Sequence, residues 1–288
     1  MGSVWRCRDR ELPLGDRTLV MGIVNVTPDS FSDGGMFVDA GAAVKHGLRL
    51  LEEGADVLDV GGESTRPGSD AVGAGVERER LLPVIEGLRR EAPEAVLSVD
   101  TRKAAVARDA LAAGADVVND IGAGVDPDMF GVVASTGAGM VLMHMKGEPK
   151  TMQREPRYED VVREVKEFLT QRAEHAVAEG VRPENVIVDP GIGFGKNLEH
   201  NLALLRDLDA IVDLGFPVLV GASRKRFIGR ITGVEEAKGR VFGTVATTVL
   251  AYEKGAKFFR VHDVRANRDA LAVAEAVLLE RSEGRRTR

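Results

Sequence analysis

The sequence predicts an α/β fold, a single (β/α)8 barrel of the TIM type with a short N-terminal extension. Two observations carry this prediction. A unit recurs along the chain, in which a glycine at an expected helix end precedes a short apolar run and a polar loop; clear copies contain Gly54, Gly114, Gly137 and Gly255. Eight such apolar runs alternate with helical patterns, and no linker interrupts them. This alternation is typical of a closed barrel, with an open doubly wound sheet as the alternative.

The eight apolar runs have the length and composition of strands that are buried on both faces of a parallel sheet. They cover residues 19–25, 57–60, 96–100, 117–119, 140–143, 186–189, 218–221 and 258–261. Apolar residues between them follow the 3.6-residue period of helices, most clearly over 40–51, 161–177, 198–208 and 270–278.

Three segments depart from this regular alternation. The second helix is the least clear, because Pro83 should start or kink it. The segment 238–253 is apolar or small nearly all round, which predicts that more than one of its faces is buried. We expect residues 1–16 to form a hairpin over the bottom of the barrel and residues 283–288 to fray, within one domain that spans residues 1–288.

Composition excludes several classes of protein. The 288 residues carry 39 basic and 45 acidic side chains, and a net charge of −6 argues against nucleic acid or an anionic membrane as the main partner. The one cysteine, Cys7, excludes an intramolecular disulfide framework and a cysteine-rich zinc site, and it favours a reducing compartment. No apolar run approaches the roughly 18 residues of a membrane span, and the first residues do not resemble a secretory signal. We therefore expect a cytoplasmic protein.

Polar residues follow every predicted strand, at the end of a barrel where active sites lie. Asp100 and Asp189 each end an apolar strand, where burial is costly for a carboxylate unless it is hydrogen-bonded. A ligand with an N–H edge would satisfy both. Asp33, taken alone, is better explained as a turn former or a helix cap. His144 follows the fifth strand and has two open interpretations, a rim residue or a packing residue.

Cations follow the last two strands. Residues 223–225, Ser-Arg-Lys, are predicted to open a helix, and Arg260 and His262 end the eighth strand. These groups predict an anion pocket beside the carboxylates. The loop 191–196 is glycine-rich but lacks the Walker A and dinucleotide-binding spacings, so we expect its glycines to let the backbone approach a flat ligand. An elongated ligand with a donor-rich heterocycle and a phosphate end fits this arrangement.

Seven motifs together resemble the dihydropteroate synthase family of folate biosynthesis, over essentially the whole chain. They are NVTPDSFSDGG at 25–35, DVGGESTRPG at 59–68, SVDT at 98–101, ND at 119–120, DPGIGFGK at 189–196, SRK at 223–225 and RVHD at 260–263. The resemblance implies a transferase that joins 6-hydroxymethyl-7,8-dihydropterin diphosphate to 4-aminobenzoate, with release of pyrophosphate. Arg102 and Arg226 depart from residues common in the family without removing a matched contact.

The resemblance also implies roles for individual residues. It assigns Asn25 as the protein ligand of Mg²⁺. Contacts to the pterin diphosphate are implied for Thr65, Asp100, Asn119, Asp189, Lys225, Arg260, Val261 and His262. Contacts to 4-aminobenzoate are implied for Phe31, Arg66, Pro67 and Ser223. Asp100, Asp33 and Lys225 are the expected catalytic residues, with the two aspartates stabilising a cation on the pterin methylene.

The family further implies a homodimer, and sulfonamides that compete with 4-aminobenzoate. Two other functions stay open at this point. One is the folate-binding barrel of corrinoid-dependent methyltransferases, which shares the pterin carboxylates but does not need the Thr-Arg-Pro-Gly loop, Arg260 or His262. The other is a pterin-binding protein that has lost catalysis.

Overall fold

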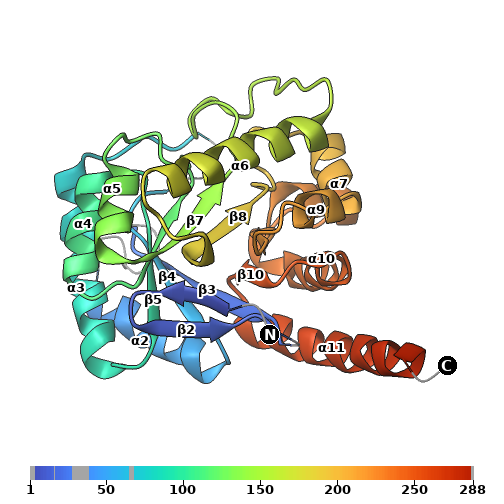
Figure 1. Cartoon of the computed structure of the whole chain (residues 1–288), viewed down its shortest axis with the longest axis horizontal. Coiled ribbons are helices and arrows are strands. Elements are labelled where there is room, and N and C mark those ends of the chain that lie inside the picture. Colours follow the sequence, from blue (N-terminus) through green and yellow to red (C-terminus); the bar gives the residue numbers. More distant parts are fainter. Residues whose placement is uncertain (1–3, 16, 28–38, 65–67, 287–288) are drawn as a thin grey trace.

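The computed structural model describes residues 4–15, 17–27, 39–64 and 68–286. Its centre is a ring of eight parallel strands, in the order β8-β7-β6-β5-β4-β3-β10-β9 (Figure 1). The ring closes between β8 and β9 through a single bridge from Val188 to Val218. The strands are β3 (Leu19–Asn25), β4 (Val57–Gly61), β5 (Val96–Asp100), β6 (Val117–Asp120), β7 (Gly139–Met143), β8 (Val186–Asp189), β9 (Leu219–Val220) and β10 (Phe258–Val261). The predicted barrel is confirmed, and the open sheet is excluded.

Helices surround the strands, and most of the apolar core lies between the two layers. They are α2 (Ala40–Glu52), α3 (Ala74–Glu91), α4 (Ala104–Ala112), α5 (Met129–Thr136), α6 (Val161–Ala178), α7 (Leu198–Arg206), α8 (Asp209–Val212), α9 (Arg226–Thr232), α10 (Val241–Glu253) and α11 (Val264–Arg286), with short 3-10 turns η1 (Pro183–Asn185) and η2 (Ala237–Arg240). The recurrent glycines Gly54, Gly114, Gly137 and Gly255 all have positive φ, as the helix-ending position requires.

Two expectations about helices compare with the structure as follows: Pro83 does not start its helix, which leaves a kink as the remaining expectation. α3 begins at Ala74, and Pro83 lies inside it. Leu81, Val84 and Leu88 on this helix are fully buried, so packing outweighs the roughly 3 kcal/mol cost of an internal proline. α11 continues to Arg286, residues 287–288 lie outside the described residues, and the expected fraying of residues 283–288 stays a prediction. Ala, Leu, Glu and Arg dominate its second half, and these residues favour helix. α11 extends outward from the rest of the molecule (Figure 1).

The N-terminal segment closes one mouth of the barrel. β1 (Val4–Cys7) and β2 (Arg10–Pro13) form an antiparallel hairpin. Trp5 is fully buried; its ring meets the ring of Phe258 edge-on at 5.0 Å, and its Nε1 donates to the carbonyl of Asn185 at 2.8 Å. The hairpin shares a core cluster with residues at the start of the strands, such as Val57. The opposite mouth, at the carboxyl ends of the strands, is therefore where a ligand can enter.

Among the described residues, no helix has both the length and the apolar content needed to cross a membrane.

Candidate active site

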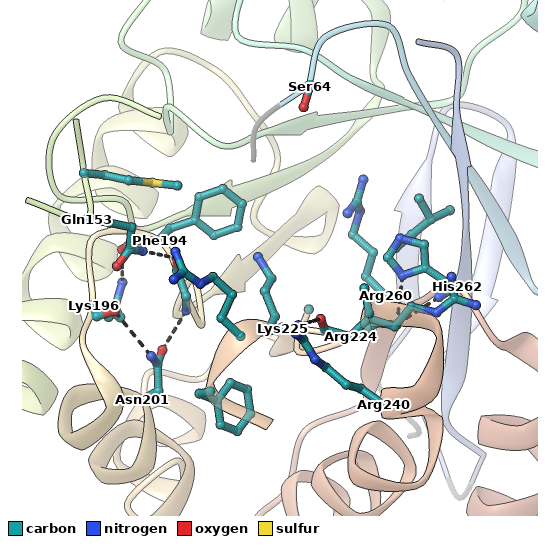
Figure 2. A pocket seen from close by; sticks show the side chains of 18 of the residues that line it. Ser64, Gln153, Phe194, Lys196, Asn201, Arg224, Lys225, Arg240, Arg260 and His262 are labelled. Atoms are coloured by element: carbon teal, nitrogen blue, oxygen red, sulfur yellow. Dashed lines mark hydrogen bonds between the residues drawn. The ribbon is translucent and has the colours of Figure 1, made fainter. Parts of the chain in front are cut away.

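A cavity of about 900 Å³ opens at the carboxyl ends of the strands. Figure 2 shows it from close by, with Lys225 and Arg260 reaching into the same space and His262 beside Arg260. Residues at or just after the carboxyl ends of β3, β4, β5, β8, β9 and β10 line it, among them Asn25, Glu63, Ser64, Asp100, Phe194, Ser223, Lys225, Arg260 and His262. Asn119 and Asp189 are buried at the ends of β6 and β8 and are not among the lining residues.

Asp59 in β4 is the centre of a buried polar network. It is fully buried and accepts hydrogen bonds from Ser98 Oγ at 2.6 Å, Asn119 Nδ2 at 3.0 Å and Arg260 Nε at 2.6 Å. A terminal nitrogen of Arg260 also donates to Asp100 Oδ2 at 2.7 Å. The network thus joins β4, β5, β6 and β10, and it holds one guanidinium between two carboxylates. Our sequence analysis did not single out Asp59 as a site residue.

The carboxylate of Asp100 faces Asn25 across Gly61. A Cβ on Gly61 would lie 3.7 Å from Asp100 Oδ2 and 3.9 Å from Asn25 Oδ1, so the missing side chain leaves space between them. Burial raises the pKa of Asp100 to about 7; the Arg260 charge opposes this shift and the Asp59 charge adds to it. Asp100 is therefore a carboxyl group whose charge depends on what binds beside it.

Asp189 presents one oxygen to the protein and one to the site. Its Oδ1 accepts from the backbone N–H of Gly191 at 2.7 Å. Its Oδ2 faces Gly221, where an added Cβ would lie 3.7 Å away, and it has no hydrogen bond from the described residues. Burial raises the pKa of Asp189 to about 6, against the opposing effect of that backbone bond. A ligand N–H would satisfy the second oxygen.

Lys225 lies among cations and an aromatic ring. Burial and the nearby Arg260 charge together lower its pKa to about 8, against the opposing effect of the Asp189 charge. Its Nζ lies 3.8 Å from the centre of the Phe194 ring, a cation–π contact visible in Figure 2. Phe194 lines the cavity and is a further residue that our sequence analysis did not assign, although it lies inside the quoted glycine-rich motif.

Ser223 and His262 are joined directly. Ser223 Oγ lies 2.9 Å from His262 Nδ1 and accepts from the backbone N–H of His262 at 3.1 Å. The residues 223–225 do not open a helix as predicted, because α9 begins at Arg226 with Lys225 as its N-cap and spans seven residues. Any anion site here therefore depends on side chains. Arg224 turns away to an ion pair with Asp263 at 2.5 Å.

Two glycines of loop 191–196, Gly191 and Gly195, serve contacts within the protein, which corrects for them our expectation of a backbone approach to a ligand; Gly193 lines the cavity. A Cβ on Gly191 would lie 2.0 Å from the carbonyl oxygen of His144, and one on Gly195 would lie 2.2 Å from that of Lys146. Buried Lys196 fastens the same two loops, with its Nζ 2.8 Å from His144 Nδ1 and 3.0 Å from the carbonyl of Phe194. Burial and the Lys196 charge lower the pKa of His144 to about 2. His144 is thus a packing residue.

Some predicted residues have other positions. The side chain of Val261 belongs to the core between the strands and the helices and does not line the cavity. Five predicted residues lie outside the described residues: Phe31, Asp33, Thr65, Arg66 and Pro67. Within the described ranges, no group of three or more His, Cys, Asp or Glu side chains is placed to hold a metal ion.

Comparison with known proteins assigns the site to a class. Residues 21–262 match the model of the pterin binding enzyme family, so the chain belongs to the pterin-binding enzymes. The dihydropteroate synthase of Synechocystis is 47% identical over 91% of this chain and 91% of its own length. A Xanthomonas albilineans dihydropteroate synthase solved with 4-aminobenzoic acid superposes with a TM-score of 0.90 at 50% identity, over 96% of this chain and 99% of that one.

A second structure of the Xanthomonas albilineans enzyme, in complex with 7,8-dihydropteroate, has a TM-score of 0.86 at 47% identity, over 96% of this chain and 98% of that one. Within the pterin-binding enzymes, the chain belongs to the dihydropteroate synthase family, and it is a transferase of folate synthesis. The resemblance inferred from the motifs is confirmed.

Proposed function

We propose that this chain joins 6-hydroxymethyl-7,8-dihydropterin diphosphate to 4-aminobenzoate, giving 7,8-dihydropteroate and pyrophosphate, through the residues described above. The observation that carries this proposal is the Asp59–Arg260–Asp100 network with Asn119 beneath one cavity that Lys225 and His262 also line. It combines acceptors for a nitrogen heterocycle with cations for a diphosphate. The complexes of the similar Xanthomonas albilineans enzyme with 4-aminobenzoic acid and 7,8-dihydropteroate support it.

The pterin ring would bind at the ends of β5, β6 and β8. Asp189 Oδ2 is placed to accept from the amino-pyrimidinone edge of the pterin, because Oδ1 is already held by Gly191. Asn119 Nδ2 donates to Asp59, and this hydrogen bond fixes the orientation of the Asn119 amide. The amide oxygen, Oδ1, accepts no hydrogen bond from the described residues. Carboxylates and amides fixed in this way distinguish a donor-rich ring from other flat ligands.

The diphosphate would bind beside the cations. Pyrophosphate is a good leaving group only when its charge is neutralised. Arg260 donates from two of its nitrogens to Asp59 and Asp100, and its other terminal nitrogen donates no hydrogen bond to the described residues. Lys225 and His262 line the same cavity. The buried carboxylates hold Arg260 in position, so that little reorganisation is needed as charge develops on the leaving group.

Asn25 fits the proposed Mg²⁺. It ends β3, lines the cavity, and has open space above Gly61. One amide oxygen is sufficient, since Mg²⁺ retains waters and phosphate oxygens as ligands. When bound, the ion would neutralise diphosphate charge. Asn25→Ala should weaken diphosphate and magnesium binding but leave binding of the free pterin largely intact, as calorimetry would measure. Equal loss of both would contradict the assignment.

The second substrate needs no strong base, because an aromatic amine is already nucleophilic. The C–O bond to diphosphate would break first, the amine nitrogen would then bond to the pterin methylene, and the amine proton would pass to water. Asp100 and Asp33 would stabilise the cation that forms on the methylene. Ser223 would receive the benzoate carboxylate, and Phe31, Arg66 and Pro67 would complete that pocket, with Thr65 contacting the pterin substrate. We assign these roles from the family resemblance.

One assay separates the possible functions. The protein is mixed with the dihydropterin diphosphate, 4-aminobenzoate and Mg²⁺, and pyrophosphate release is followed. Release that requires all three components is expected. Binding of the pterin without release would leave the catalytically inactive protein as the explanation. Methyl transfer from a methylated folate to a corrinoid, without pyrophosphate release, would favour the methyltransferase barrel. Asp189→Ala is the negative control, because it removes the carboxylate oxygens that are proposed to bind the pterin.

A second copy of this chain is the proposed partner, and the cytoplasm is the proposed compartment. Adjacent helices α10 and α11 carry large exposed apolar side chains: Phe242 is 84% exposed, Val273 67%, Leu250 60% and Val277 55%. More than one face of the segment 238–253 would then be buried, as the sequence predicts. Light scattering should give a dimer, and Phe242→Glu should give a monomer. A monomeric wild-type chain at micromolar concentration would overturn this proposal.

A further inference from the structure

Two side chains that the proposed function does not use hold the backbone of Gly193 in place. Gln153, in the loop between β7 and α6, donates from Nε2 to the carbonyl of Gly193 at 2.6 Å. Asn201 on α7 accepts from the backbone N–H of Gly193 at 2.6 Å, and its Nδ2 donates to the carbonyl of Asn197 at 2.5 Å. Figure 2 shows Gln153, Asn201 and Phe194 together on one side of the cavity. The peptide groups on both sides of Gly193 are therefore fixed by neighbouring elements.

The segment held in this way contacts Lys225 along its side chain. A Cβ on Gly193 would lie 3.1 Å from Lys225 Cδ, so the backbone of Gly193 packs directly against the methylene chain. The next residue, Phe194, has its ring centre 3.8 Å from Lys225 Nζ. Lys225 Nζ donates no hydrogen bond to any residue that the structure describes. The position of this ammonium in the cavity therefore depends on Gly193 and Phe194.

We propose that Gln153 is a positioning residue for the reaction. By holding the carbonyl of Gly193, it keeps the Gly193–Phe194 segment against Lys225 and the ammonium of Lys225 inside the cavity. The inference rests on the proposed function, which assigns Lys225 to the pterin diphosphate. Gln153 lines the same cavity, but this role needs no contact with a substrate. A neutral amide suits the role, because it supplies a hydrogen-bond donor without adding to the positive charge of Lys225 and Arg260.

Loss of the Gln153 donor would act on Lys225 through its surroundings. The carbonyl of Gly193 would lose that partner, the segment would relax, and Lys225 would move toward water. The charged groups that face Lys225 are Asp189 on β8, Asp100 on β5, Arg260 on β10 and Lys196 in the glycine loop. Burial is the largest influence on Lys225 and lowers its pKa to about 8, so movement toward water raises that pKa. The pH above which diphosphate affinity falls should then rise above about 8.

The experiment measures the Kd of the dihydropterin diphosphate by calorimetry at pH 7, 8 and 9, for the wild type and three variants. Gln153→Met keeps the length of the side chain and removes the donor, and Gln153→Ala removes both. Tyr158→Phe is the matched control, because Tyr158 Oη donates to the carbonyl of Gly195 at 2.9 Å in the same loop. Gly195 lies against Lys146 and not against Lys225. Thermal unfolding of each variant shows that it is folded at the temperature of the titration.

At pH 7 both Gln153 variants should raise the Kd by about 2- to 10-fold, the effect of one hydrogen bond. The ratio of variant to wild-type Kd should shrink by pH 9, where Lys225 of the wild type has lost its proton and Lys225 of the variants keeps it. Tyr158→Phe should follow the wild type at each pH. A ratio that is the same at every pH would overturn the inference, and so would the same pH-dependent change in Tyr158→Phe. A wild-type chain that does not bind the dihydropterin diphosphate would instead overturn the proposed function, so the two failures are distinguishable.

Discussion

Replacing Asp59 by asparagine tests whether the buried network both stabilises the barrel and shapes the pterin site. The two side chains have the same shape, and the hydroxyl of Ser98 can rotate to accept from the new amide. What is lost is the negative charge 2.6 Å from Arg260 Nε, at a fully buried position. Removing one partner of a buried ion pair costs about 3–5 kcal/mol, and Arg260 keeps Asp100 as a second partner. We therefore expect a loss of about 2–3 kcal/mol in the free energy of unfolding.

The same substitution should weaken pterin binding. Asn119 would lose its charged acceptor, and Arg260 would move toward Asp100, so both the amide and the cation would leave their positions. A loss of about 2 kcal/mol in affinity is a roughly 30-fold rise in Kd. Removing the Asp59 charge should also lower the pKa of Asp100, because that charge raises it. Urea denaturation and calorimetric titration with the dihydropterin diphosphate measure the two losses.

Asp116→Asn is the matched control, because Asp116 is also buried and holds an arginine, Arg89, at 2.7 Å. It precedes β6, at the closed end of the barrel. This variant should lose stability without any change in pterin affinity. If Asp59→Asn kept wild-type affinity while losing stability, the network would be structural only, and its role in the site would be refuted.

Three further outcomes are expected. Asp189→Asn should cost about 2–4 kcal/mol of pterin affinity, because an amide replaces a paired charge; calorimetry showing no change would remove Asp189 from the pocket. Diphosphate binding should weaken as pH rises through about 8, because burial lowers the pKa of Lys225 to that value and the neutral amine no longer attracts phosphate. An affinity that is independent of pH between 7 and 9 would argue against a role of Lys225 in binding the diphosphate. Lys103→Met should cost about 3 kcal/mol of stability, because it leaves Glu63 and fully buried Glu77 without the ammonium that contacts both at 2.5 Å; urea denaturation should show recovery when Glu77→Leu is added.

The barrel was predictable because its signal is local and repeated. Each strand is a short apolar run, and several helices end at a glycine whose positive φ the structure confirms, as at Gly54 and Gly114. The exceptions are the places where tertiary contacts decide. Pro83 does not start a helix, because the apolar face of α3 is buried on both sides of it. The start of α9 at Arg226 depends on the turn at Arg224, whose backbone has positive φ.

The site was predictable only in part, because residues at strand ends can be read from the sequence but their partners cannot. The same reasoning that selected Asp100 and Asp189 applies to Asp59, since a carboxylate inside the apolar run 57–60 is costly unless it is paired. Its partners lie on β5, β6 and β10, and only the closed ring brings them together. The contacts of loop 191–196 with the loop after β7 escape sequence analysis for the same reason.

The charge balance of the network explains why two aspartates surround one arginine. If Arg260 paired with Asp59 and not with Asp100, its charge would be neutralised by Asp59. Asp100 would then be a buried carboxyl group without a neighbouring cation, and it would strongly prefer to keep its proton. If Arg260 paired with Asp100 and not with Asp59, its guanidinium would be free to move with the departing diphosphate. Together they hold the guanidinium in position and leave the pKa of Asp100 at about 7, where it responds to a positive charge beside it. A cation that forms on the pterin methylene would favour the ionised carboxylate at the moment it is needed, so the network links the binding of the ring to the stabilisation of the intermediate.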